Sequence, residues 1–218
     1  VRPDHTGHYG VRVELDPVEQ RVLGSLLEKQ RTVPATYPLS LNALRTACNQ
    51  TTNREPVTNY DDPTISAAID RLKARELART VWAGGGSRVL KYHQRLDEAL
   101  ALSDPDRAVL TVLLLRGPQS AGELRTRTER LHPFTDRSTL QATLESMAAA
   151  GLVEELSRRP GQQEPRWTHL LGPEHSRELP AAVDREAPLA EGVGARNARV
   201  RDHYDALADA ATPPGGDL

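Results

Sequence analysis

Residues 61–93 read DDPTISAAIDRLKARELARTVWAGGGSRVLKYH, and this stretch decides the fold class. Asp62-Pro63 is typical of a helix start, because an aspartate oxygen caps free N–H groups and proline fits the first turn. Apolar residues then recur at helical spacing, at Ile65, Ala68, Ile69 and Leu72. Residues 77–83 and 89–93 predict two strands, and the glycine run between them predicts the tip of a hairpin.

Two further helices are expected before this stretch. Asp16-Pro17 repeats the helix-start signal, and the apolar face that follows consists of Val18, Val22, Leu23, Leu26 and Leu27. Ser40 caps a second, shorter helix that carries Leu41, Leu44 and Ala47. Three helices followed by a hairpin are the order of a winged helix, in which the second and third helices form a helix-turn-helix and the hairpin is the wing.

The same order recurs further along the chain. Helix starts are predicted at Ser103-Asp104-Pro105, Ser120 and Asp136, followed by a hairpin around Pro160-Gly161. Four apolar positions of the first unit match four of the second at one offset of 75 residues: Ile65, Ile69, Leu72 and Leu77 with Leu140, Leu144, Met147 and Leu152. The starts of the two first helices lie 88 residues apart, so 13 extra residues belong to loops 31–38 and 49–61 of the first unit. The sequence therefore predicts a mainly α fold with small β-hairpins, arranged as tandem winged-helix domains.

These boundaries divide the chain into four parts. They are a flexible tail (1–13), a first winged-helix domain (14–98), a second winged-helix domain (99–172), and a linker with a short helix and a disordered end (173–218). Seven of the 16 prolines lie from Pro160 onward, which is typical of a segment that buries little apolar surface.

Composition narrows the class of protein. The chain has 28 basic and 30 acidic residues, whereas a protein that coats nucleic acid without specificity is usually more basic. Its single cysteine, Cys48, cannot form an internal disulfide and is expected to be a buried small hydrophobic residue. No apolar leader is visible, and the longest apolar run, 108–115, is too short to span a membrane. We therefore expect a cytoplasmic protein with no membrane association.

No enzyme signature occurs in the sequence. It contains no phosphate-binding loop, no zinc-protease histidine pair and no nucleophile elbow. His5 and His8 have no cysteine or carboxylate framework for a metal ion. We expect no catalytic residue, no metal and no cofactor.

A local charge bias is the strongest functional signal. Seven basic residues and one acidic residue lie between Arg71 and Arg95, a segment that covers the end of the third helix and the wing. Phosphate contacts of a winged helix fall on these elements, and small side chains at the front of the helix let it approach base edges. The candidate DNA-binding residues are Arg54, Thr64, Ser66, Ala67, Arg71, Lys73, Arg75, Arg88 and Lys91. The alternative is a solvated, arginine-rich surface, since the front of the helix offers no Arg, Asn or Gln for base readout.

The loop 49–61 is long for the turn of a helix-turn-helix. Three asparagines, Asn49, Asn53 and Asn59, can hydrogen-bond turn backbone, so we expect the loop to be ordered. We also expect it to place Arg54 beside the start of the third helix, where Arg54 contacts either a phosphate or a carboxylate of its own domain.

Several segments carry a family resemblance. RVLGSLLEKQ (21–30), YPLSLNAL (37–44), ACNQ (47–50), NREPV (53–57), LLLRGPQ (113–119), GELR (122–125) and residues 164–171 resemble the YceH-like family of uncharacterised bacterial proteins. The resemblance covers about residues 14–172. It implies tandem winged helices and a homodimer.

The expected function is that of a transcriptional regulator, not an enzyme, which contacts double-stranded DNA through the third helix and wing of its first domain. The alternative is a winged-helix scaffold that binds no DNA, similar to chromosome-condensation accessory subunits. The second unit is expected to mediate dimerisation or to pack against the first. Basic residues of 71–95 that share one exposed face favour DNA binding, and basic residues paired with acids of the second unit favour the scaffold.

Overall fold

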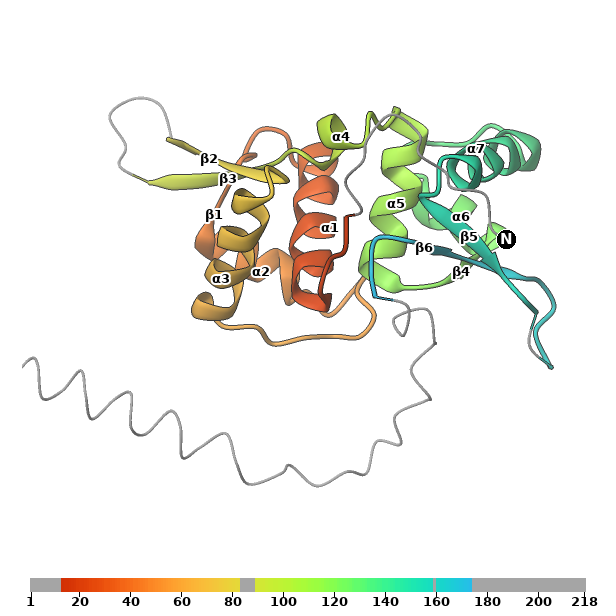
Figure 1. Ribbon diagram of the computed structural model, residues 1–218, viewed down its shortest axis with the longest axis horizontal. Helices are drawn as coiled ribbons and strands as arrows, with labels where there is room; N and C mark the ends of the chain where they lie inside the picture. The colour runs from red at the N-terminus through yellow and green to blue at the C-terminus, as the bar shows by residue number, and fades with distance from the viewer. Residues whose placement is uncertain (1–12, 83–88, 159, 174–218) are drawn as a thin grey trace, which may run out of the picture. The chain divides into compact units, whose positions relative to one another are not determined.

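The computed structural model describes residues 13–82, 89–158 and 160–173 (Figure 1). In its first half the elements are α1 (Pro17–Thr32), β1 (Leu39–Ser40), α2 (Leu41–Cys48), α3 (Asp62–Ala74), β2 (Ala78–Trp82), β3 (Leu90–Gln94) and α4 (Leu96–Ala99). In its second half they are α5 (Asp104–Arg116), β4 (Gln119–Ser120), α6 (Ala121–Thr128), α7 (Arg137–Ala149), β5 (Val153–Leu156) and β6 (Arg166–His169). The fold is therefore mainly helical with small antiparallel sheets, as the sequence predicts.

Each half contains one three-stranded sheet, ordered β1-β3-β2 in the first and β4-β6-β5 in the second. The strands of the first hairpin lie within one residue of the predicted segments 77–83 and 89–93, and β5 and β6 flank the predicted turn at Pro160-Gly161. The short strands β1 and β4 and the one-turn helix α4 were not predicted. The predicted hairpin tip (84–86), the short helix predicted in the C-terminal part, and residues 1–12 of the predicted N-terminal tail lie outside the described residues.

The predicted repeat is confirmed at the level of secondary structure. Helices α3 and α7 both contain 13 residues, and α7 begins 75 residues after α3. Strand β5 follows β2 at the same offset. The connection between α2 and α3 is longer than that between α6 and α7, so part of the extra length of the first half lies in the loop 49–61.

Side-chain caps start most of these helices, because the first turn of a helix leaves N–H groups without backbone acceptors. Asp16 and Glu19 form a capping box at α1, and Asp136 caps α7. Hydrogen bonds from Thr139 and Ser138 lower the pKa of the exposed Asp136 to about 2. The cap of α3 is Asp61 rather than the predicted Asp62, since the Asp61 side chain accepts the N–H of Thr64.

The two halves pack into one unit through α1 and α5, which lie side by side (Figure 1). Both helices bury unbroken runs, Glu19–Leu27 in α1 and Ala108–Leu115 in α5. A helix buried on all sides has neighbours on all sides, and here each helix packs against its own half and against the other helix. The second half therefore packs against the first, which is one of the two roles expected for it.

Contact between these helices is close because Gly24 has no side chain. A Cβ atom at Gly24 would lie 2.9 Å from the side chain of Leu115. Two backbone hydrogen bonds also join the halves, from the N–H of Leu15 to the carbonyl of Leu171 (2.7 Å) and from the N–H of Glu55 to the carbonyl of Leu115 (2.9 Å). Within the described residues, no helix combines the length and apolar character needed to cross a bilayer.

Candidate functional site

The front of α3 carries the three small candidate residues. Ala67 is exposed, whereas Thr64 and Ser66 are half-buried. Hydrogen bonds from the side chain and backbone of Thr64 lower the pKa of the capping Asp61. This end of the helix therefore presents small side chains beside a carboxylate that stays ionised.

Arg71 and Arg75, at the other end of α3, hold the start of α1. Arg71 Nε lies 3.1 Å from Glu19 Oε1, and its Nη2 lies 2.6 Å from Asp16 Oδ2. Arg75 Nη2 contacts the same Glu19 oxygen at 2.7 Å. The Glu19 side chain is only 4% exposed, while those of Arg71 and Arg75 are 48% and 36% exposed. The two arginines thus neutralise a buried carboxylate and keep part of each guanidinium in solvent.

The other paired basic residues of the segment 71–95 also find acids within the first half. Lys73 contacts Asp70 at 3.1 Å, and Arg95 contacts Glu98 at 2.9 Å. No ion pair between this segment and the second half occurs among the described residues. Pairing of these basic residues with acids of the second half was expected for a scaffold protein that binds no DNA. The structure does not show this pairing in the part of the chain that it describes.

Two basic residues of the wing stand apart from these pairs. Arg79 lies opposite His93 across the β2–β3 ladder, and Lys91 lies opposite Val81. Because side chains alternate along a strand, Arg79 and Lys91 point to the same face of the sheet as diagonal neighbours. Neither forms an ion pair within the described part of the chain. Arg88, the other wing candidate, lies outside it.

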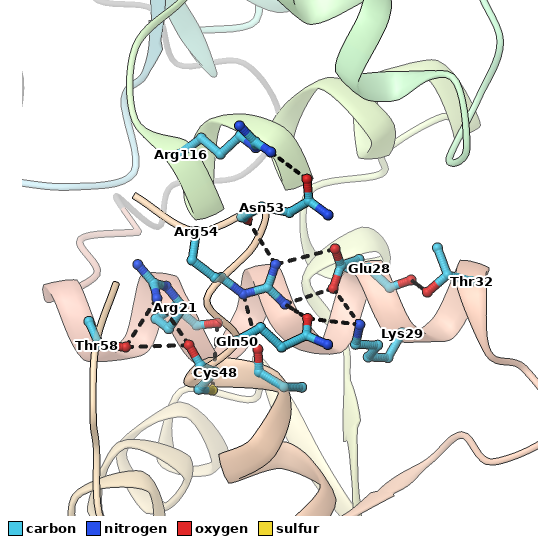
Figure 2. Close-up of polar contacts among 11 residues, drawn as sticks. Arg21, Glu28, Lys29, Thr32, Cys48, Gln50, Asn53, Arg54, Thr58 and Arg116 are labelled. Carbon is cyan, nitrogen blue, oxygen red and sulfur yellow. Dashed lines mark hydrogen bonds and ion pairs between the residues drawn. The ribbon is translucent and has the colours of Figure 1, made fainter. Parts of the chain in front are cut away.

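Arg54 is not available for a phosphate contact, and this prediction was wrong. Figure 2 shows its guanidinium directed at Glu28 of α1, with Nη2 2.7 Å from Oε2 and Nη1 3.2 Å from Oε1. Arg54 Nε donates to the carbonyl of Ala47 at the end of α2, and the side chain is 0% exposed. It therefore lies against α1 and α2 rather than beside the start of α3. The expected alternative, a contact with a carboxylate of its own domain, is correct.

A second buried arginine, Arg21 of α1, was not predicted as a structural residue. Its Nη1 donates to the carbonyl of Cys48 at 3.0 Å (Figure 2). Its Nη2 donates to the carbonyl of Pro56 at 2.6 Å. Burial, followed by the charge of Arg54, lowers the pKa of Arg21. Carbonyl oxygens of α2 and of the loop 49–61 thus close around this side chain, which fixes the loop on α1.

The loop 49–61 is ordered, as the sequence predicts. The side chain of Asn49 donates to the carbonyl of Tyr60 and accepts its N–H, both at 2.8 Å. Asn53 has a φ of 59°, a left-handed conformation that asparagine adopts more readily than most residues. Its side chain accepts a hydrogen bond from Arg116 of α5. The loop therefore spans the contact between the two halves.

The Arg54–Glu28 pair leads to a pH prediction. Burial alone would raise the pKa of Glu28, but the hydrogen bond and charge of Arg54, followed by those of Lys29, lower it below its ordinary value of 4.5. A carboxylate with a lowered folded-state pKa stabilises the fold fully above its unfolded-state value and loses this contribution as the pH falls below it. We expect the unchanged protein to lose more unfolding free energy than Glu28→Gln when urea unfolding is repeated below pH 4.5. Equal losses in the two proteins would contradict the assignment.

A cleft of about 550 Å³ lies beside this network. Helices α1, α5 and α6 and the loop 49–61 line it, and its charged side chains include Arg116, Arg127 and Arg130 of the second half. The sequence prediction did not locate this cleft, since it expected the second half only to mediate dimerisation or to pack against the first. The run of arginines at 125, 127 and 130 is the signal that could have drawn attention to it.

The described residues contain neither a group of side chains placed to bind a metal ion nor a reactive thiol. No group of three His, Cys, Asp or Glu side chains among them is placed to hold a metal ion. His5 and His8 lie outside the described residues. Cys48 is buried as predicted, and burial raises the pKa of its thiol to about 11, so the thiol stays protonated at neutral pH.

These features define the class of the protein as a mainly helical chain in which a unit of three helices and a three-stranded antiparallel sheet occurs twice. The family model described as "Protein of unknown function, DUF480" matches residues 15–162, and the chain belongs to this family.

Curated relatives carry the name UPF0502 protein. One from Pelobacter propionicus is 46% identical over 198 residues, which cover 88% of this chain and 90% of the relative. One from Geotalea daltonii is 51% identical over 74% of each chain. One from Dechloromonas aromatica is 50% identical over 78% of this chain and 79% of the relative. The resemblance stated from the sequence motifs agrees with this membership.

Proposed function

We propose that both halves are winged helices and that the first half binds double-stranded DNA as a transcriptional regulator. In this assignment α2 and α3 form the helix-turn-helix and the β2–β3 hairpin is the wing. Helix α3 enters the major groove with Thr64, Ser66 and Ala67 near the base edges. Such a protein is a binding protein rather than an enzyme.

The observation that carries the proposal is the pair Arg79 and Lys91 on one face of the wing, where Arg79 is exposed and Lys91 is half-buried. Most basic side chains nearby are held by carboxylates, whereas these two are not paired within the described residues. A phosphate can therefore bind them without displacing an internal partner. Wing residues of a winged helix lie next to the DNA backbone, where contacts position the protein on the duplex.

Arg71 and Arg75 have a supporting role in this proposal. Their contacts with Glu19 hold both side chains at the end of α3. Because each guanidinium is partly exposed, N–H groups that Glu19 and Asp16 do not use can reach a phosphate. The carboxylates weaken the local positive charge, so the wing contributes more to binding than this end of the helix.

Wing substitutions test the proposal. We expect Arg79→Ala and Lys91→Ala each to weaken binding to a mixed-sequence duplex and to reduce the slope of log K against log salt by about one unit. Fluorescence anisotropy at several salt concentrations measures both quantities. Arg125→Ala is the matched control, because Arg125 is an exposed arginine of α6 outside the proposed surface. Unchanged affinity and slope in both wing variants would remove the wing from any DNA interface.

The scaffold function remains the second candidate, favoured by the apolar end of the wing. Trp82 is 68% exposed and lies opposite Leu90, which is 41% exposed. A protein partner, including a second copy of the chain, could bury these side chains. In this case Trp82→Ser lowers the mass observed by light scattering and leaves DNA affinity unchanged. The mass of the unchanged protein in the same light-scattering measurement also tests the expected homodimer.

A further inference from the structure

The lining of the cleft between the halves includes several cationic and amide side chains that can donate hydrogen bonds. Arg116 lies at the end of α5, and Arg127 and Arg130 lie on and just beyond α6. From the first half, Gln50 and Asn53 of the loop 49–61 also line the cleft. The volume of about 550 Å³ is within the range typical of small-ligand sites.

The oxygen atoms of the two amide side chains already accept hydrogen bonds from cationic side chains. Gln50 Oε1 accepts from Arg54 Nη2 at 3.0 Å and from Lys29 Nζ at 3.1 Å. Asn53 Oδ1 accepts from Arg116 Nη2. Because the oxygen of each amide is used by a cation, its NH₂ group is the end left to donate, as Figure 2 shows for both side chains.

The charges of the lining are unevenly balanced. Glu28 is neutralised by Arg54 at 2.7 Å and Lys29 at 2.9 Å. Arg116 and Arg130 have no carboxylate partner within the described residues, and Glu129 is the lining carboxylate without a cation there. Arg127 shares Glu123, at 3.4 Å, with Arg166. Two lining arginines therefore have no ion-pair partner in the described part of the chain, against one such carboxylate, although the more distant charges of Glu55 and Glu123 also act on Arg116.

The positive charge of Arg127 near Arg116 also indicates that the cleft favours an anion. Burial, followed by the positive charge of Arg127, lowers the pKa of Arg116. Arg116 nevertheless stays protonated, since a guanidinium does not lose its proton in proteins at neutral pH. Neighbouring arginines that repel each other are stabilised when an anion binds between them.

We propose that this cleft binds a small ligand that carries a phosphate group, held by Arg116 and Arg130 and by the amide NH₂ groups of Gln50 and Asn53. Arginine forms paired hydrogen bonds with phosphate oxygens, and the cleft is enclosed by elements of both halves. The ligand bridges the two halves, so its binding stabilises the contact between them. The proposal is independent of DNA binding by the wing.

Isothermal titration of the full chain with pyrophosphate and with adenosine monophosphate tests the site. We expect saturable binding and a higher melting temperature for at least one of these probes, because a ligand that binds only the folded state stabilises it. Arg116→Gln and Arg130→Gln should each weaken binding about tenfold or more, as expected for a lost charged hydrogen bond. Arg130 is exposed and has no ion-pair partner among the described residues, so its variant keeps the test valid if Arg116→Gln folds poorly.

Arg125→Gln is the matched control, since Arg125 is an exposed arginine of α6, the helix that ends two residues before Arg130, and does not line the cleft. Equal weakening by Arg125→Gln, or no saturable binding of either probe at millimolar concentration, would overturn the proposal.

Competition with a short DNA duplex distinguishes a small ligand from the DNA backbone. If DNA competes with pyrophosphate and loses affinity in the cleft variants but not in the wing variants, the cleft is a contact for the DNA backbone and the small-ligand proposal is wrong. Loss of DNA binding only in the wing variants leaves the cleft proposal intact.

Discussion

Arg54→Ala is expected to lower the free energy of unfolding by about 3–5 kcal/mol, the loss typical of a buried ion pair from which one partner is removed. The Arg54 side chain is 0% exposed and that of Glu28 is 13% exposed, so water cannot replace the lost contacts. The substitution also leaves the carbonyl of Ala47 without the Nε donor of Arg54. Urea unfolding followed by circular dichroism measures the change.

The control for Arg54 is Arg45→Ala. Arg45 pairs with Asp62 at 3.3 Å, but both side chains are at least 40% exposed. Exposed pairs contribute about 1 kcal/mol or less. Comparable losses in the two variants would show that burial of the Arg54 pair has no energetic role.

Gly24→Val is expected to destabilise the protein by about 3 kcal/mol, because it inserts a side chain into the packed contact between α1 and α5. A Cβ atom at Gly24 would lie 2.9 Å from Leu115 Cγ and Cδ2 and 3.1 Å from Leu114 Cβ. The Leu114 atom is fixed by its backbone and cannot rotate away. Gly24→Ala should cost less, since alanine gains up to about 1 kcal/mol of helix propensity over glycine.

Gly122→Ala is the comparison for Gly24→Ala. In α6 the atoms nearest to a Cβ at Gly122 lie 3.7 Å away, which is an ordinary contact distance. We expect this variant to be as stable as the unchanged protein or slightly more stable. If Gly24→Val also leaves the melting temperature unchanged, the two helices are not in close contact in solution.

Local signals made most of the fold predictable. Caps depend on residues three positions apart, and the apolar face of a helix depends on positions three and four apart. Asp16 and Ser103 therefore located their helices, and the offset shared by Ile65 and Leu140 located the repeat. The Asp61 cap was missed because Asp61 and Asp62 offer the same chemistry in adjacent positions.

The hydrogen bonds and the ion pair of Arg54 could not be predicted from such local signals. Arg54 and Glu28 are 26 residues apart, and Arg21 and Cys48 are 27 apart. An arginine in a polar loop resembles a surface residue until its partner is known, which is why Arg54 was assigned to DNA. The cleft depends on side chains from both halves, so the separate patterns of the halves did not reveal it.

The apolar run Ala108–Leu115 also indicated how α5 is packed, which its length alone does not show. Eight consecutive buried positions exceed what one face of an amphipathic helix can hold. Such a run indicates a helix enclosed on opposite sides, and α5 is enclosed by its own half and by α1.

The shared helix pair limits how the two repeats can diverge over generations. In a chain of independent domains, each copy accumulates substitutions without regard to the other. Here Leu115 belongs to the second copy but sets the size allowed at Gly24 of the first, and its carbonyl accepts the N–H of Glu55. A larger residue at either helix surface is tolerated only when the opposite copy changes with it. We therefore expect substitutions at these two helix surfaces to be coupled, and we expect exchange of a single repeat between relatives to disturb the packing of α1 on α5.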